Sequence, residues 1–290
     1  MLRYRADVRT LCFVAAYFVA LGWAWSVPLR ARLLVGCALA LLSELSWINA
    51  VITHNVVHLP LWRSAVLNKW TRAVLTLTYG FPVNDYVPGH NLSHHRFLQQ
   101  RRDVMRTTRV RLGWNLANIL MFFPSVAFDV LRTNAQYARF AKDARRAWYR
   151  ERNLQLGLAW AIHLTAVLID YKRALLFVFV PHLCALWGIT TVNYLWHDGC
   201  DVKHAHNHSR NFVGHLFNWL HFNRGFHGMH HLQPALHWSL LPGKHAELLA
   251  PYVHPALEQR SFATYLLRTF VFGWDRLRYD GARLVLPEED

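Results

Sequence analysis

The chain has 290 residues, of which 53% are hydrophobic and only 17% are charged. It carries 32 Lys and Arg against 17 Asp and Glu, a formal charge of +15, together with 19 His and 13 Trp. This apolar composition argues against an ordinary soluble enzyme. Because we find no zinc-finger, RNP or basic-zipper motif, nucleic acid is not the expected partner, and we expect the basic residues to face a membrane.

Four apolar stretches have about the length needed to cross a bilayer, which is roughly 17 to 25 helical residues. In chain order they cover residues 11–27, 33–52, 154–169 and 174–195. Short turns at Pro28 and at residues 170–173 join them in pairs, so the sequence predicts two hairpins of transmembrane helices. The sequence after Val27 lacks a small-residue cleavage site, so we expect the first stretch to be retained. Two weaker stretches, 73–83 and 116–131, predict interfacial or re-entrant helices.

The positive charges indicate how these spans are oriented. Of the 32 Lys and Arg, 28 lie in the two termini and in the segment between the hairpins, whereas 4 lie in the two turns. Basic residues accumulate on the cytoplasmic side of a membrane protein. We therefore expect an integral, multi-pass membrane protein with both termini on the cytoplasmic side, which would be an inner or plasma membrane if the source is bacterial.

Histidines gather in three groups next to the ends of the predicted spans. Residues three or four apart share one face of a helix, so the members of each group can converge on a small ion. His95, directly after His94, suits a second ion beside the first. The groups are His54 and His58; His90, His94 and His95; and Asn193 and His197 followed by His227, His230 and His231.

So many imidazoles exceed what one four- to six-coordinate ion can bind, so two metal ions are implied. The sequence lacks the HExxH motif of many zinc hydrolases. It also lacks the Glu-x-x-His pairs of soluble di-iron bundles, because Glu is nearly absent near the groups. The pattern therefore predicts two metal ions held almost entirely by nitrogen, at the cytoplasmic face of a membrane.

The three groups resemble the histidine boxes of the membrane-bound fatty acid desaturase superfamily, which also contains hydroxylases and carotenoid ketolases. The resemblance implies an all-α fold: four transmembrane helices in two hairpins, with a cytoplasmic helical cap at 53–153 and 196–290 that holds a di-metal site, in a single domain over 1–290. It also implies two iron ions, with Asn193 acting directly or through a water. One departure is that His90 and His94 are four residues apart, where the commonest desaturase form has three. The implied ligands are His54, His58, His90, His94, His95, Asn193, His197, His227, His230 and His231.

The resemblance implies a dioxygen-dependent enzyme that oxidises an acyl chain or another lipid. Desaturation is the expected reaction, and hydroxylation or ketone formation on the same scaffold is the alternative. A non-catalytic metal-binding or transport protein is a more distant alternative, because transporters place ionisable residues at the bilayer midplane. The sequence has no recognisable flavin, iron–sulfur or cytochrome domain, so we expect an external electron donor of the ferredoxin, rubredoxin or cytochrome type.

Further polar residues lie near these groups in the sequence. Asp85, Asp198 and Asp201 are candidates to orient metal-bound histidines through hydrogen bonds, beside Asn55 and Asn91. The alternating run of His204, His206 and His208 predicts a solvated loop. Isolated histidines are expected to be surface or hydrogen-bonded residues, namely His163, His182, His245 and His254.

Overall fold

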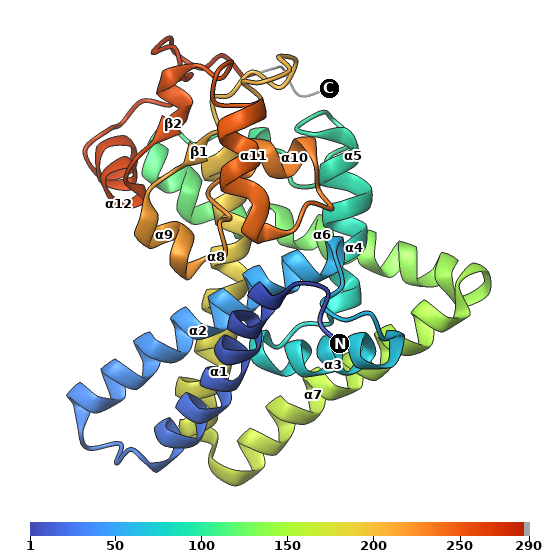
Figure 1. The fold of residues 1–290 in the computed structure, drawn as a ribbon. Helices are drawn as coiled ribbons and strands as arrows, with labels where there is room; N and C mark the ends of the chain where they lie inside the picture. The colour runs from blue at the N-terminus through green and yellow to red at the C-terminus, as the bar shows by residue number, and fades with distance from the viewer. Residues whose placement is uncertain (287–290) are drawn as a thin grey trace. The chain divides into compact units, whose positions relative to one another are not determined.

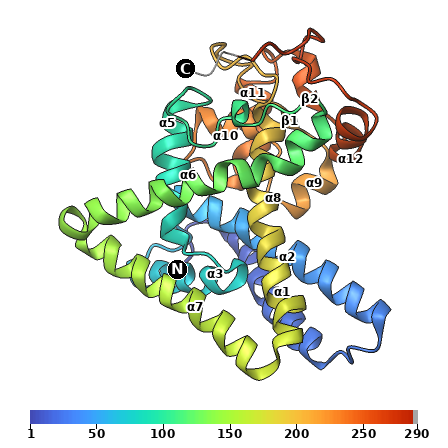
Figure 2. The same cartoon turned by 180° about the vertical axis from the view of Figure 1, so that it is seen from behind.

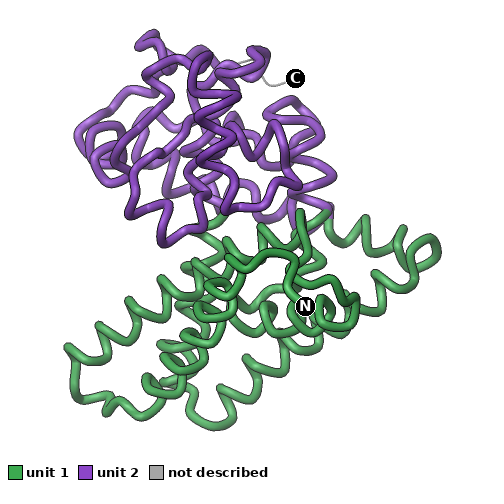
Figure 3. Tube along the Cα trace, viewed as in Figure 1, with its two compact units in different colours: residues 1–87, 134–189 green, residues 88–133, 190–290 purple. Residues whose placement is uncertain are grey.

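The computed structural model describes residues 1–286 of the chain. The chain divides into two compact units, each assembled from two separate segments (Figure 3). Unit 1 comprises residues 1–87 and 134–189, and unit 2 comprises residues 88–133 and 190–290. Helices make up most of both units, as predicted, and within the described residues one pair of two-residue strands is the exception to an all-helical fold (Figure 1).

In unit 1, helices α1 (Val8–Ser26) and α2 (Arg32–His58) lie side by side in both views (Figures 1 and 2). Val27 has extended backbone, which the following Pro28 favours, so α1 stops there. Ala20, Ala24 and Ala38 are buried where the two helices meet. Small side chains allow a close helix approach, which is how helices commonly pack in lipid.

Helix α3 (Ala65–Tyr79) begins at Ser64, whose Oγ accepts the N–H of Leu67, and ends at Gly80. Gly80 has a φ of +72°, and a Cβ there would lie 2.3 Å from Nδ1 of His182. Only glycine meets both requirements. The helix therefore starts and ends earlier than the apolar stretch 73–83, and it packs against α7.

Helix α7 (Arg146–Ala174) is interrupted at Asp170, where the backbone is extended. The Asp170 side chain accepts the N–H groups of Lys172 and Arg173 at 3.0 and 3.1 Å, so it caps the helical segment that follows. That segment continues through a π-helical turn (Leu175–Phe179) into α8 (Val180–His197). The interruption falls inside the turn predicted at residues 170–173.

Three polar side chains from α1, α7 and α8 form a hydrogen-bonded chain inside unit 1. The hydroxyl of Tyr17 lies 2.9 Å from Nε2 of His182, whose Nδ1 lies 3.1 Å from Nε2 of His163. Nδ1 of His163 lies 2.6 Å from the carbonyl oxygen of Ala159. Both histidines are thus hydrogen-bonded, as expected for isolated histidines.

Unit 2 is built mainly from short helices and long connections. Strands β1 (Asn211–Phe212) and β2 (Glu258–Gln259) pair in parallel, with Asn211 opposite Glu258. Helices α10 and α11 contact each other. The helices of unit 2, with those that it shares with unit 1, are α4 (Tyr86–Gly89), α5 (His95–Phe97), α6 (Asn115–Ala144), α9 (His215–Leu220), α10 (His227–Leu232), α11 (Leu241–Leu248) and α12 (Phe262–Leu266).

Four helical stretches among the described residues are long and apolar enough to cross a membrane: Arg5–Ser26, Arg32–His58, Asn115–Ala144 and Arg146–His197. The number equals the predicted number of spans, but the sets differ. The last stretch contains both predicted spans of the second hairpin, separated by the interruption at Asp170. Helix α6 is much longer than the apolar stretch 116–131, and Pro124 does not end it. Its interfacial placement stays a prediction.

Candidate metal centre

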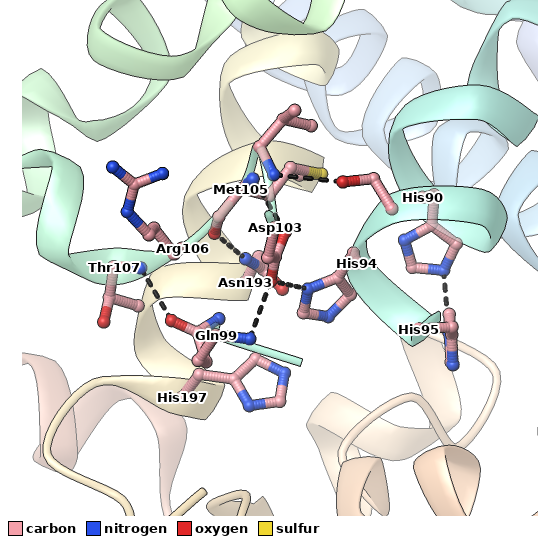
Figure 4. Close-up of polar contacts among 12 residues, drawn as sticks. His90, His94, His95, Gln99, Asp103, Met105, Arg106, Thr107, Asn193 and His197 are labelled. Carbon is pink, nitrogen blue, oxygen red and sulfur yellow. Dashed lines mark hydrogen bonds and ion pairs between the residues drawn. The ribbon is translucent and has the colours of Figure 1, made fainter. Parts of the chain in front are cut away.

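The second histidine group forms a π-helical turn, His90–His94, followed directly by α5. In a π-helix, residues five apart in the sequence follow one another along one face. Nε2 of His90 therefore lies 3.1 Å from Nε2 of His95 (Figure 4). The expectation that His90 converges with His94 on one ion was wrong, because it assumed the spacing of an α-helix. His90 lies with His95 instead.

His90 and His95 are joined by His230, which α10 supplies. Nε2 of His230 lies 3.0 Å from Nε2 of His95, and the candidate ligand nitrogens of the three residues lie within 4.8 Å of one another. We call these residues the three-histidine group. All three belong to unit 2.

A second cluster in unit 2, the four-histidine group, consists of His94, His197, His227 and His231, with ligand nitrogens within 4.8 Å of one another. Nε2 of His197 lies 2.9 Å from that of His227 and 3.2 Å from that of His231. The latter two nitrogens are 3.0 Å apart. His94 and His95 thus point into different groups, as the sequence predicts for adjacent histidines.

Asp103 orients His94. Its Oδ2 lies 2.9 Å from Nδ1 of His94, and both side chains are fully buried. The same carboxylate accepts the N–H of Gln99 at 2.9 Å and, through Oδ1, the N–H of Met105 at 2.8 Å (Figure 4). Nδ1 of His94 must donate to the carboxylate, so its Nε2 keeps a free electron pair for an ion.

His197 and His227 are held by other means. Nδ1 of His197 donates to the carbonyl oxygen of His208 at 3.0 Å, which fixes the same tautomer as in His94. The ring of His227 stacks on the buried indole of Trp196, with centroids 4.1 Å apart. Both supports come from the end of α8 and the loop after it.

Sequence reasoning missed Asp103, and the carboxylates that it proposed have other partners. Asp85 forms an ion pair with Arg152 in unit 1, and Asp198 forms one with Arg276 in unit 2. Asp201 accepts the N–H of Lys203 in a turn. The available signal was that Asp103 is the sole acidic residue between His90 and Asp129, in a segment rich in arginine.

Burial keeps the imidazoles of His227 and His231 neutral. Burial lowers the pKa of His227 well below its ordinary value, and the nearby Arg224 lowers it further. Burial also lowers the pKa of His231 well below its ordinary value, and the neighbouring His227 lowers it further. Burial by itself raises the pKa of Asp103, but His94 and the N–H groups of Gln99 and Met105 outweigh it, and the pKa lies below its usual value. Neutral imidazole is the form that binds metal.

The four-histidine group suits a cation. Nε2 of His94 is buried and has no hydrogen-bond partner within the described residues. Nε2 of His197 can only accept, because Nδ1 donates to a carbonyl oxygen. A buried acceptor nitrogen without a donor, such as Nε2 of His94, is costly unless a positive ion lies beside it. The donor set, nitrogen throughout, fits iron and related transition metals.

The first histidine group lies on the last turn of α2, in unit 1. The rings of His54 and His58 face each other with centroids 4.9 Å apart, as their spacing of four residues predicts. His54 is fully buried, and its Nδ1 lies 3.3 Å from Oδ1 of Asn55. Asn55 is thus one predicted orienting residue that does contact a box histidine.

Asn193 is buried on α8, and its Nδ2 donates to the carbonyl oxygen of Met105 at 2.9 Å (Figure 4). This bond leaves Oδ1 as the atom that can face an ion or a water. In the predicted solvated loop, His204 is exposed, as expected, and His206 is partly exposed. His208 is buried with its ring 5.9 Å from that of His231, so for this residue the expectation was wrong.

Strained backbone flanks the second and third groups. Leu98 and Gln99 follow α5 with φ of 25° and 60°, and Phe222 and Asn223 precede α10 with φ of 52° and 57°. Such conformations cost residues other than glycine about 1–3 kcal/mol each, and they persist where surrounding contacts hold them. The bond from Gln99 to Asp103 is one such contact.

A protein-family model described as fatty acid desaturase matches residues 24–263 of the chain. The matched range includes every residue of the three histidine groups and Asn193. No curated protein matches the chain.

Proposed function

The chain belongs to the fatty acid desaturase family, and from this premise we propose that it is a di-iron, dioxygen-dependent desaturase that introduces a double bond into an acyl chain. Family membership makes it an oxidoreductase of fatty acid metabolism. Together with the four apolar helical stretches, it also makes the chain a multi-pass membrane protein. The observation that carries the proposal is the pair of separate histidine groups.

We assign one iron ion to the four-histidine group: His94, His197, His227 and His231. The other is assigned to His90, His95 and His230. The family's first histidine box implies that His54 and His58 are iron ligands as well. Asn193 would contribute through Oδ1, directly or through a water.

When bound, the two iron ions would use dioxygen, two external electrons and two protons to remove two hydrogens from adjacent carbons, with two waters as the other product. The residues of the chain prepare this chemistry. Asp103 and the carbonyl group of His208 hold His94 and His197 in the tautomer whose Nε2 is an acceptor. Burial and Arg224 keep His227 neutral, and Trp196 fixes the plane of its ring.

Substrate and electrons come from outside the chain. The family implies a lipid substrate, carried as acyl-lipid, acyl-CoA or acyl-carrier protein. A ferredoxin, rubredoxin or cytochrome-type partner would supply electrons, docking on the basic residues of the side that carries the metals, which we place in the cytoplasm. This sidedness rests on the distribution of Lys and Arg.

The test is to express the chain with a ferredoxin and its reductase, and to follow its lipids by mass spectrometry and its metal by elemental analysis. We expect lipids lighter by two hydrogens, dependent on oxygen, and two iron ions per chain. Gain of one oxygen would instead assign a hydroxylase. One tightly bound zinc ion, or no oxygen consumption, would contradict the di-iron proposal.

A further inference from the structure

A pocket of about 330 Å³ lies between α3 and α7 in unit 1, on residues that the metal centre does not use. Two cationic side chains line it, Lys69 from α3 and Arg150 from the second turn of α7. Both are exposed, and neither has a hydrogen bond or ion pair within the described part of the chain.

The pocket also contains one carboxylate, that of Glu151. Nε of Arg72 lies 2.5 Å from Oε1 of Glu151, and Nε2 of Gln155 donates to the same oxygen at 3.2 Å. The charge of Glu151 is therefore matched by Arg72, and Lys69 and Arg150 leave the pocket with a net positive charge. An anion is the ligand that such a pocket favours.

The pocket also has apolar lining residues, Ala73, Ala147 and Leu154. Leu154 opens the uncharged part of α7: no Asp, Glu, Lys or Arg lies between Arg152 and Asp170. On α3, the exposed side chain of Trp70 lies next to Lys69. Cations and an exposed Trp directly before an apolar helical stretch are typical of the level of lipid headgroups.

We propose that this pocket binds the phosphate of an anionic phospholipid, such as phosphatidylglycerol, with Lys69 and Arg150 on the phosphate and an acyl chain along Leu154. A zwitterionic lipid offers the same phosphate but carries its own cation, which Lys69 and Arg150 repel. The proposal concerns a site outside the histidine groups and does not depend on the reaction.

The experiment uses the full chain in detergent and counts bound lipids by native mass spectrometry. We expect phosphatidylglycerol to bind at least about tenfold better than phosphatidylcholine, because each basic residue near an anionic lipid contributes roughly a fivefold factor. The double variant K69Q/R150Q should lose about 25-fold in phosphatidylglycerol binding, and each single variant about fivefold. The matched control K142Q/R145Q removes the same charge from exposed residues that do not line the pocket.

Equal binding of the two lipids, or undiminished binding to K69Q/R150Q, would overturn the proposal. An equal loss in K142Q/R145Q would also overturn it, because net charge would then explain the effect. Displacement of the lipid by millimolar inorganic phosphate would show a free-anion site and not a lipid site. Because Lys69 and Arg150 are exposed, thermal unfolding of the double variant should match that of the parent chain.

Discussion

The histidines of the metal centre could be predicted from the sequence because ligands of one ion tend to recur at helical spacing. Asp103 could not be predicted in the same way. It lies nine residues after His94, beyond two residues in left-handed conformation, and no periodicity links positions across such a loop. Asp85, Asp198 and Asp201 were equally plausible in sequence, and the structure separates them by their partners.

His94→Ala removes a member of the four-histidine group, so we expect loss of one iron ion and of all measurable desaturation. His206→Ala changes a partly exposed imidazole stacked on Tyr252, and this variant should retain both iron ions and the desaturation activity. Metal analysis and lipid mass spectrometry of the two variants check this expectation. An active His94→Ala enzyme would contradict the ligand assignment.

Asp103→Asn keeps the size of the side chain but replaces one acceptor oxygen with an N–H₂ group. In the parent chain the carboxylate of Asp103 accepts three hydrogen bonds. The amide of the variant would lose at least one of them and leave His94 poorly fixed. We expect iron affinity to fall about 10- to 100-fold, measured by competition with a chelator. Asp201→Asn, which alters only a turn, is the control and should stay within about twofold of the parent.

At the scale of elements, the helical nature of each segment followed from apolar runs and spacing, whereas the type of helix at the second group did not. A π-turn amounts to one extra residue inserted into an α-helix. It places His90 and His95, five apart, where an α-helix places residues four apart. The unusual spacing of His90 and His94 is therefore compensated by the backbone.

Deleting Asn91 would bring His90 to four residues from His95 and turn the π-turn into regular α-helix. We expect this variant to bind both iron ions, because the two imidazoles stay on one face. Inserting one alanine after Asn91 is the matched control; it rotates His90 away and should cost one iron ion. Metal analysis distinguishes the two, and loss of iron in the deletion alone would refute this account of the turn.

At the scale of the molecule, the family match ends at residue 263, yet the segment after it contacts the metal-bearing part of unit 2. Arg276 pairs with Asp198, the residue after His197, and donates to the carbonyl oxygens of Val110 and Thr107 at 2.7 and 3.0 Å. Burial by itself lowers the pKa of Arg276, but Asp198 outweighs it and the pKa is raised. Because the partners are 78 positions apart, sequence spacing could not predict the pair.

Arg276→Lys keeps the charge but loses the planar fork that serves Asp198 and two carbonyl oxygens at once. We expect the free energy of unfolding to fall by about 2–3 kcal/mol, seen as a lower thermal midpoint and faster loss of iron. Arg278→Lys is the control, because Arg278 is 43% exposed and pairs with Asp280 at the surface. That change should cost less than about 0.5 kcal/mol. Equal thermal midpoints for the two variants would contradict the proposed stabilising role of Arg276.

The hydrogen-bonded chain inside unit 1 has a direction. The carbonyl oxygen of Ala159 can only accept, so His163 must donate from Nδ1 and, when neutral, accept at Nε2. His182 then donates from Nδ1 to His163 and accepts at Nε2, and the hydrogen of Tyr17 points to His182. All three hydrogen bonds are therefore donated in the same direction, from α1 through α8 to α7. Tyr17→Phe would remove the first hydrogen bond. A methyl group on Nδ1 of His182 would break the second and leave the direction of the others unchanged.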